Sequence, residues 1–262
     1  TIHLNSFKTA VVANKRVYVG NINQTIDDVT TQFSDRMLKS PVNQFDKFPS
    51  KNFVDVSIND GSQIIHLATF ADKILQFKED VMYIINIAED SEYLESTHKF
   101  KGVTTGASVC TTDHGIAWAN GDGAYLFDGD KVHDILEQGG QQLISLADWQ
   151  AFAFTPLVGY IPDKRQVVFV DDVGTAGDGS VYIFDVTTRS WVKGSAGTLP
   201  NAIKSNFIND YDNNLVFYDY TNKVMYKWSN TAAITSGLGI TLKDMDFDAP
   251  GVKKRVFKVY VS

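Results

Sequence analysis

Apolar and polar residues alternate in short runs that recur along the chain, and the clearest runs end at an aspartate. Residues 123–127, 180–184 and 214–218 are examples, and an aspartate follows each of them at position 128, 185 or 219. Turn-forming residues come next, and a second short apolar run follows the turn. Alternation with a period of two, bounded by Asp, Asn, Gly and Thr, predicts a strand, a tight turn and a second strand. Its recurrence predicts a repeat architecture.

Strand-like runs fall into successive groups of four. The first group opens with a hairpin that turns at Asn14 and Lys15, and a last run at 256–261 begins a further strand or completes the first sheet. The groups are residues 9–13, 16–20, 36–39 and 53–57; residues 63–67, 74–78, 81–86 and 93–97; residues 107–112, 115–119, 124–127 and 131–135; residues 157–160, 166–170, 181–184 and 190–192; and residues 205–208, 215–218, 224–228 and 240–244.

Each group spans roughly 45 residues, which is the size of one β-propeller blade. We therefore predict an all-β fold, a β-propeller of about five to six four-stranded antiparallel blades, with residues 1–262 as a single domain. A β-sandwich is the alternative, but it requires one or two sets of about seven to nine strands, whereas about twenty short runs are present. Residues 1–4 or 256–261 could supply the strand that completes the last blade.

One segment has helical periodicity. Leu143, Leu146 and Ala147 have the i, i+3, i+4 spacing of one helix face, so we predict a short helix over residues 141–149 that bridges two blades. Residues 23–34 are polar and rich in Thr and Asp, so we expect a loose connection there.

The next segment, residues 41–49, contains prolines at both ends, and sheets tolerate proline poorly. We expect it to form a loop that its phenylalanines, Phe45 and Phe48, anchor to the fold. This loop would join two strands of the first group.

The composition is typical of a globular β protein, and it argues against nucleic acid as a partner and against a membrane span. Aromatic residues make up 12% of the 262 residues, and strands favour aromatic side chains. The net charge of −7 argues against nucleic acid as a direct partner, because phosphates require a basic surface, so we expect no sequence-specific nucleic-acid binding. No run of about 18 or more apolar residues is present, so we predict no membrane span.

Metal and thiol chemistry has little support in the sequence. Cys110 is the single cysteine, so an internal disulfide is excluded, and its strand-like surroundings predict a buried structural thiol. The absence of disulfides is compatible with assembly in a reducing cytoplasm. None of the five histidines has the spacing of a metal motif, and we expect His66 and His133 to be ordinary strand residues.

The other candidates for chemistry are acidic turns and tryptophans. Residues 171–179 concentrate Asp and Gly but lack the spacing of a Ca²⁺ loop, so we expect a flexible turn. The sequence contains no nucleophile elbow, phosphate loop or dinucleotide fingerprint. We therefore predict no catalytic, cofactor-binding or metal-binding residue, no cofactor, and a protein that is not an enzyme. The chain has four tryptophans, and we expect their rings to pack between blades; they are Trp118, Trp149, Trp191 and Trp228.

Both ends of the sequence look like cuts through a longer polypeptide. The chain opens at Thr1 without a Met or a signal-like segment, and it closes on a run that has the pattern of a strand. We expect this chain to be a fragment of a longer protein. The one basic cluster, residues 253–255, lies just before the final run, and we expect a solvated turn there.

A family resemblance is densest between residues 35 and 130. It rests on residues 35–40, 48–49, 54–57, 60–64, Leu67, 70–72, Leu75, 77–78, Tyr83, 115–118, 123–125 and 128–129, and the segments 243–247 and 252–260 extend it. The order of these segments resembles the β-propeller part of phage virion proteins near the portal and tail, such as the tail nozzle (tail tubular protein B) of short-tailed phages. The pattern covers roughly residues 10 to 260, and it contains no invariant chemical signature.

This resemblance implies a non-catalytic virion structural protein of a phage tail or neck. Such a protein would be assembled in the host cytoplasm into the virion, as a homo-oligomeric ring around the DNA conduit. Its partners would be other tail or portal-adjacent virion proteins. The alternative is a carbohydrate-binding or carbohydrate-cleaving propeller that uses Trp118, Trp191 or Trp228 as sugar platforms.

Overall fold

A computed structural model describes residues 2–57, 61–89, 91–152, 156–170, 180–194, 206–219 and 222–228. Contacts divide the chain into two units, Thr1–Trp228 and Ser229–Ser262, and every described residue belongs to the first unit. The strands predicted at 240–244 and 256–261, the basic cluster at 253–255 and the acidic loop at 171–179 lie outside the described residues.

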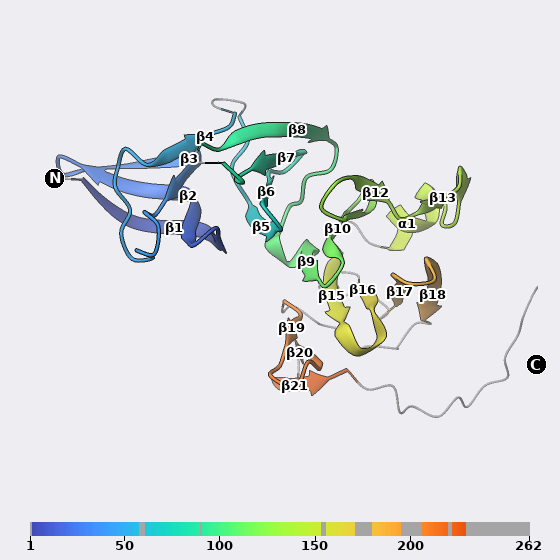
Figure 1. Cartoon of the computed structure of the whole chain (residues 1–262). Coiled ribbons are helices and arrows are strands. Elements are labelled where there is room, and N and C mark those ends of the chain that lie inside the picture. Colours follow the sequence, from blue (N-terminus) through green and yellow to red (C-terminus); the bar gives the residue numbers. More distant parts are fainter. Residues whose placement is uncertain are drawn as a thin grey trace, which may run out of the picture. The chain divides into compact units, whose positions relative to one another are not determined.

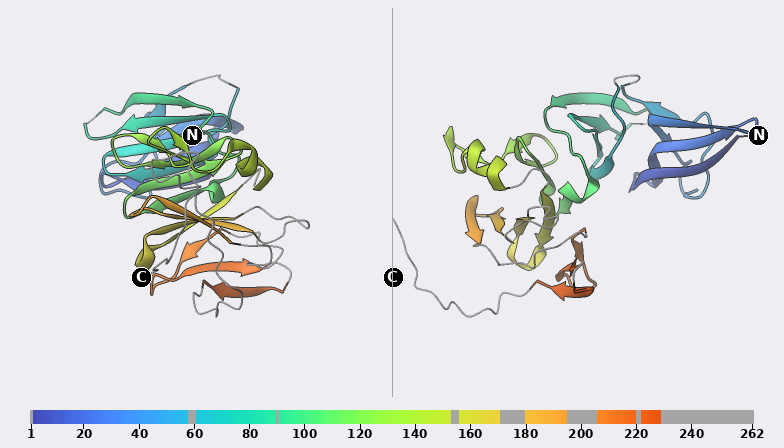
Figure 2. Two further views of the ribbon diagram at one scale, coloured as in Figure 1. Left: turned by 90° about the vertical axis from the view of Figure 1, so that its right-hand side faces the viewer. Right: turned by 180° about the vertical axis from the view of Figure 1, so that it is seen from behind.

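The described residues form five antiparallel meanders, and strand order follows sequence order in each (Figure 1). Tight turns join β1 to β2 and β2 to β3, whereas a longer loop, residues 40–52, joins β3 to β4; Figure 2 gives two further views. These meanders are named blades 1 to 5.

Blade 1 contains β1 (Ile2–Ala13), β2 (Arg16–Ile26), β3 (Val29–Lys39) and β4 (Phe53–Asp55). Blade 2 contains β5 (His66–Phe70), β6 (Lys73–Phe77), β7 (Val81–Asn86) and β8 (Tyr93–Lys99). Blade 3 contains β9 (Val109–Thr112), β10 (Gly115–Asn120), β11 (Gly123–Phe127) and β12 (Val132–Asp134). Blade 4 contains β15 (Leu157–Ile161), β16 (Gln166–Val170), β17 (Val181–Asp185) and β18 (Ser190–Gly194). Blade 5 contains β19 (Ile208–Asn209), β20 (Leu215–Asp219) and β21 (Val224–Lys227).

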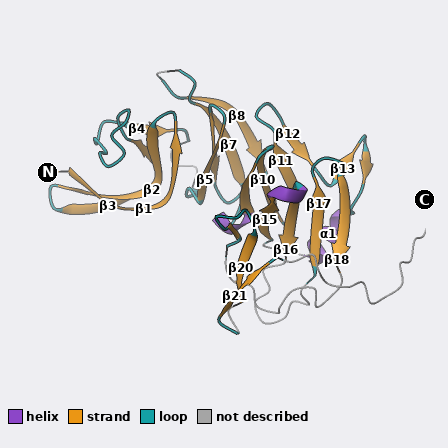
Figure 3. Cartoon of the chain, turned by 60° about the horizontal axis from the view of Figure 1, so that its bottom comes forward, coloured by secondary structure: helices purple, strands orange, loops and turns teal. Residues whose placement is uncertain are grey.

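Strands dominate the described part of the chain, as Figure 3 shows by colour. A two-stranded ribbon and a short helix join blade 3 to blade 4, and 3-10 turns precede β9 and β16. These elements are β13 (Glu137–Gln138), β14 (Gln141–Gln142), α1 (Leu146–Phe152), η1 (Gly106–Ser108) and η2 (Pro162–Lys164).

Consecutive blades pack face to face through continuous apolar clusters. The ring of Phe77 in blade 2 meets that of Trp118 in blade 3 edge to face, with 5.3 Å between ring centroids. Edge-to-face geometry is a favoured arrangement of aromatic pairs and adds to the gain from burial. The other junctions are represented by Tyr18 with Ile74 between blades 1 and 2, Leu126 with Phe169 between blades 3 and 4, and Val168 with Leu215 between blades 4 and 5.

The first strands of successive blades also contact one another. β1 contacts β5, β5 contacts β9, β9 contacts β15, and β15 contacts β19. Inner strands of adjacent blades meet in this way in a β-propeller, where each blade packs on its neighbours. The prediction of an all-β propeller built from four-stranded antiparallel blades is therefore confirmed, and blades 1 to 4 have four strands each.

The predicted first hairpin is present and is longer than expected. Ala13 pairs with Arg16, and the two residues between them, Asn14 and Lys15, have φ angles of 46° and 58°. Two successive positive φ angles define a type I′ turn, whose twist matches that of the flanking strands. Asn tolerates this conformation well, which explains why the sequence signal was readable.

The expectation of a loose connection at residues 23–34 was wrong. β2 continues to Ile26, and β3 begins at Val29 after a second turn, at Asp27 and Asp28 with φ angles of 47° and 66°. Polar residues dominate this hairpin because one of its faces is a ladder of side-chain hydrogen bonds, described below. The N-terminal segment was one of two candidates for the strand that completes the last blade. Residues 2–4 belong to β1 instead, where Ile2 pairs with Ile26 inside blade 1.

Two further predictions need adjustment. The helix starts later than expected, at Leu146, and residues 141–142 form β14 instead. Its buried side chains are Trp149 and Phe152, whereas Leu143 and Leu146 are exposed, so the predicted apolar face was wrong. The first strand of blade 2 begins at His66 and not at residue 63.

Candidate functional site

The recurring aspartates close hairpin turns. The Asp128 carboxylate accepts hydrogen bonds from the backbone N–H groups of Asp130 and Lys131, at 2.9 and 2.8 Å. Asp185 and Asp219 make the same kind of contact at the ends of β17 and β20. An aspartate that bonds to backbone N–H groups two and three residues later stabilises a turn, so these carboxylates are structural.

Asp128 also contacts His133, whose Nε2 lies 2.7 Å from the carboxylate. Partial burial opposes ionisation of Asp128, but the backbone N–H groups and His133 outweigh it and lower its pKa to about 2. His133 therefore lies in a strand, as predicted, with one ring nitrogen committed to a turn.

Cys110 and His66 lie in strands and lack the features of reactive groups. Burial raises the pKa of the Cys110 thiol to about 12, so almost no thiolate exists at neutral pH. Burial lowers the pKa of His66 in β5, which favours the uncharged ring. In the described part of the chain, no group of three or more His, Cys, Asp or Glu side chains is placed to hold a metal ion.

Three of the tryptophan indoles donate to backbone carbonyls from the interior. Trp118 and Trp149 are fully buried, and their Nε1 atoms donate to Lys101 O and Asn120 O, at 3.0 and 2.8 Å. Trp191 is half-buried and donates to Ile135 O at 2.8 Å, which joins blade 4 to the end of blade 3. Trp228 is half-buried beside the apolar cluster between blades 4 and 5. The ring of Trp118 is therefore closed to a stacking ligand.

A buried polar triad links blades 1 and 2. Glu92 accepts hydrogen bonds from the Tyr18 hydroxyl at 2.9 Å and from Lys39 Nζ at 2.5 Å. Burial of Tyr18 and the adjacent Glu92 carboxylate raise the pKa of its hydroxyl above the ordinary value. These contacts tie β2 and β3 of blade 1 to the connection between β7 and β8 of blade 2.

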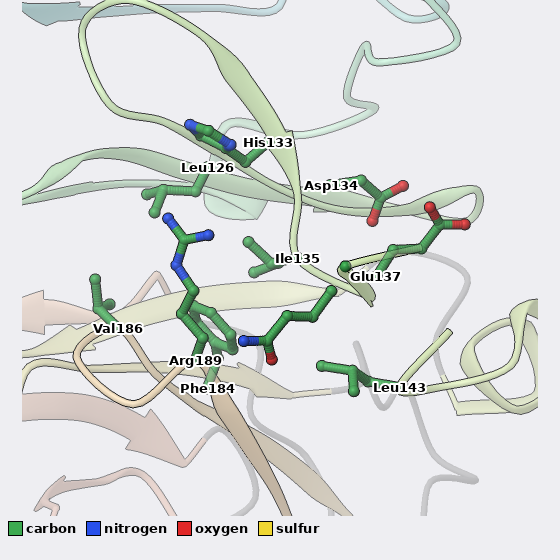
Figure 4. A pocket seen from close by; sticks show the side chains of 11 residues that line it. Leu126, His133, Asp134, Ile135, Glu137, Leu143, Phe184, Val186 and Arg189 are labelled. Carbon is green, nitrogen blue, oxygen red and sulfur yellow. The ribbon is translucent and has the colours of Figure 1, made fainter. Parts of the chain in front are cut away.

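The pocket in Figure 4 lies at the junction of blades 3 and 4 and has a volume of about 240 Å³. Apolar side chains, including Ile135 and Phe184, line it, and Arg189 reaches in on the side of His133. The carboxylates of Asp134 and Glu137 lie together on the other side. The titratable side chains in its described lining are therefore His133, Asp134, Glu137 and Arg189.

The outer half of the β1–β3 sheet, which we name the arm, has one polar face. Asn5 donates to Thr25 at 2.8 Å, and the hydroxyls of Thr25 and Thr30 lie 2.9 Å apart. Further along the same face, Asn23 donates to Ser6 and Gln32 donates to Asn21. These cross-strand pairs satisfy the polar groups within the arm itself.

The opposite face of the arm is mainly apolar. Ile22 pairs with Phe7 and Phe33 at the base, Ile26 pairs with Val29 next to the tip turn, and the polar pair Gln24 and Thr31 lies between them. Ile22 is completely buried in the apolar cluster at the base, which Phe48 from the loop before β4 joins. Phe7 at the base and Val29 at the tip are 49% and 64% exposed. The sequence pattern did not reveal this surface, because polar residues interrupt the apolar alternation of these strands.

A second exposed apolar surface lies on blade 5. Ile208 pairs with Val216, which pairs with Lys227, so these three side chains share one face. Met225 lies on the same face, and the other face carries Leu215 and Phe217, which pack against blade 4. On the outward face, Ile208 and Met225 are 53% and 61% exposed. We name this surface the blade 5 outer face.

None of the described helices has the length and apolar content needed to cross a bilayer. No known family model matches the chain, and no curated protein sequence matches it. Among solved structures, Hsv2 from Kluyvelomyces marxianus is similar with a TM-score of 0.48 and 9% identity, over 91% of this chain and 78% of that chain. A likeness of this size carries no argument about function, and the fold assignment rests on the strand order and blade contacts given above.

Proposed function

We propose that this chain is a non-catalytic structural protein of a phage tail or neck, similar in role to a tail nozzle. In this proposal it assembles as a homo-oligomeric ring around the DNA conduit and contacts other tail or portal-adjacent proteins in the virion. The proposal combines the family resemblance of the sequence with one structural observation, the exposed apolar face of the arm.

The arm supports an assembly role because exposed apolar surface is costly in an isolated protein. Phe7, Ile26 and Val29 are all partly or largely exposed along one sheet face. Exposed apolar side chains gathered on one face mark contact sites between proteins. The polar ladder on the other face holds the strands together without a packed core on that side, so the apolar face is available to a partner.

The chemistry of the described residues also fits a structural role. The recurring carboxylates close turns, the Cys110 thiol is held in its neutral form, and the Tyr18 triad ties two blades together. A net charge of −7 suits a conduit wall that does not grip passing DNA, because like charges repel phosphates.

The mass of the purified chain tests this proposal, by size-exclusion chromatography with light scattering, alone and with a purified tail ring. We expect a discrete oligomer, either alone or once the ring is added. A strict monomer that binds no tail component would contradict the proposal. A glycan array run on the same sample tests the carbohydrate alternative, and specific hits with a monomeric chain would favour it.

A further inference from the structure

We propose that the apolar face of the arm of one copy docks on the blade 5 outer face of a second copy. This contact rests on the proposed function, because it supplies the subunit interface that a ring requires. A contact between two different surfaces repeats from copy to copy and closes into a ring when the rotation allows it.

The two surfaces match in chemistry. Each is a sheet face with exposed apolar side chains, Phe7 and Val29 on the arm and Ile208 and Met225 on blade 5. Burying them against each other removes apolar area from water on both sides, which is the main favourable contribution to protein association. Each surface also lies on a terminal blade of the described series, so neither is covered by the junctions between consecutive blades.

Charges of opposite sign lie at the edges of the two surfaces. Asp28 lies in the tip turn of the arm, directly beside Val29. Lys227, which also interacts with the Asp210 carboxylate, shares the blade 5 outer face with Met225, and Lys223 lies in the turn before β21. An interface with a carboxylate edge against an ammonium edge is favoured in its correct register and disfavoured in others.

The same charges argue against symmetric pairing of like surfaces. An arm on a second arm would bring the two Asp28 carboxylates together, and a blade 5 face on a second blade 5 face would bring lysines together. Like charges placed opposite each other weaken association. The arrangement therefore favours a head-to-tail contact between copies.

Charge exchange tests this contact. Asp28→Lys and Lys227→Asp each place like charges across the interface, so each variant alone should raise the self-dissociation constant by about tenfold or more. Both substitutions in one chain should restore association, and so should an equimolar mixture of the two single variants. Val29→Ser, at an exposed position, should weaken association without any change of charge. The readout is sedimentation velocity over a concentration series.

Asp130→Lys and Lys164→Asp are matched controls, because both side chains are exposed and lie on neither surface. They should leave association unchanged. Oligomers whose self-dissociation constant is unchanged by Asp28→Lys and by Lys227→Asp would contradict the docking contact but not the proposed function. A chain that stays monomeric, alone and with a tail ring, would overturn both.

Discussion

At the scale of single residues, the aspartates in the turns carry the repeat signal that made the fold readable. Asp128 accepts two backbone N–H groups and contacts His133, and Asp185 and Asp219 close equivalent turns. In the sequence these aspartates are candidates for a chemical role, but in the structure their carboxylates stabilise turns.

Replacing Asp128 with Ala should lower the free energy of unfolding by about 1 kcal/mol, because two backbone N–H groups lose their acceptor. Asp130→Ala is the control, since it removes a neighbouring carboxylate from the same turn. Urea denaturation followed by circular dichroism measures both variants at neutral pH. Equal midpoints for the two variants would contradict the assignment of Asp128 as the turn acceptor.

The pKa of Asp128, lowered to about 2, sets the pH dependence of its contribution. A depressed pKa stabilises the folded state above the ordinary value of about 3.9, and this stabilisation is lost as the pH falls through the folded pKa. His133→Gln should raise the pKa toward the ordinary value, because a charged partner is removed. Carboxyl NMR titration measures it, and an unchanged midpoint would rule out the contribution of His133.

Cys110 provides a test of burial. Because its pKa is raised to about 12, the folded protein should react with a thiol reagent at pH 8 at least about tenfold more slowly than the urea-unfolded chain. It is the single cysteine, so the labelled fraction reports on this site alone. Rapid stoichiometric labelling of the folded protein would show that the thiol is accessible.

At the scale of elements, the sequence predicted strands wherever one face is apolar and the turn residues are distinctive. The hairpin at Asn14 and Lys15 and the strands of blades 2 to 4 were readable for this reason. The arm was not, because its polar ladder interrupts the apolar alternation over residues 23–34. The helix face was misjudged because Trp149 and Phe152 pack against rings from later strands, including Trp191, which local spacing does not reveal.

The connection between blades 2 and 3 depends on a close backbone approach at Gly102. A Cβ at this position would lie 2.3 Å from the backbone oxygens of Lys78 and Glu79, so Gly102→Ala must displace the β6–β7 turn. We expect a loss of more than about 2 kcal/mol or an insoluble product.

Gly61→Ala is the control for Gly102→Ala, because its Cβ would meet nothing within 4 Å and only its φ of +80° opposes the change. Its cost should be about 1 kcal/mol. Thermal unfolding of both variants measures the difference. Equal losses would contradict the close approach at Gly102.

At the scale of the whole molecule, the blades form a series in which each junction buries large side chains. Trp118 and Trp149 are fully buried in adjacent clusters, so truncation of either ring should destabilise the two blades that share its cluster. The candidate assembly surfaces lie on blades 1 and 5, where the series of described junctions ends. Sequence patterns predicted the repeat but not these surfaces, because a docking face depends on which side chains the tertiary packing leaves uncovered.

Trp149→Ala should lower the free energy of unfolding by about 3–5 kcal/mol, because a large buried ring is lost at the junction of blades 3 and 4. Unfolding should remain one transition by fluorescence and by circular dichroism, since each blade depends on its neighbours. Two separate transitions in the parent protein would contradict this coupling between blades.

The proposed function makes this chain a subunit of a symmetric assembly. Electron microscopy of the purified chain, alone and mixed with a purified tail ring, tests this proposal. We expect closed particles with rotational symmetry, in which each copy contacts the next through different surfaces. Single separated particles at every concentration and in both samples would contradict it.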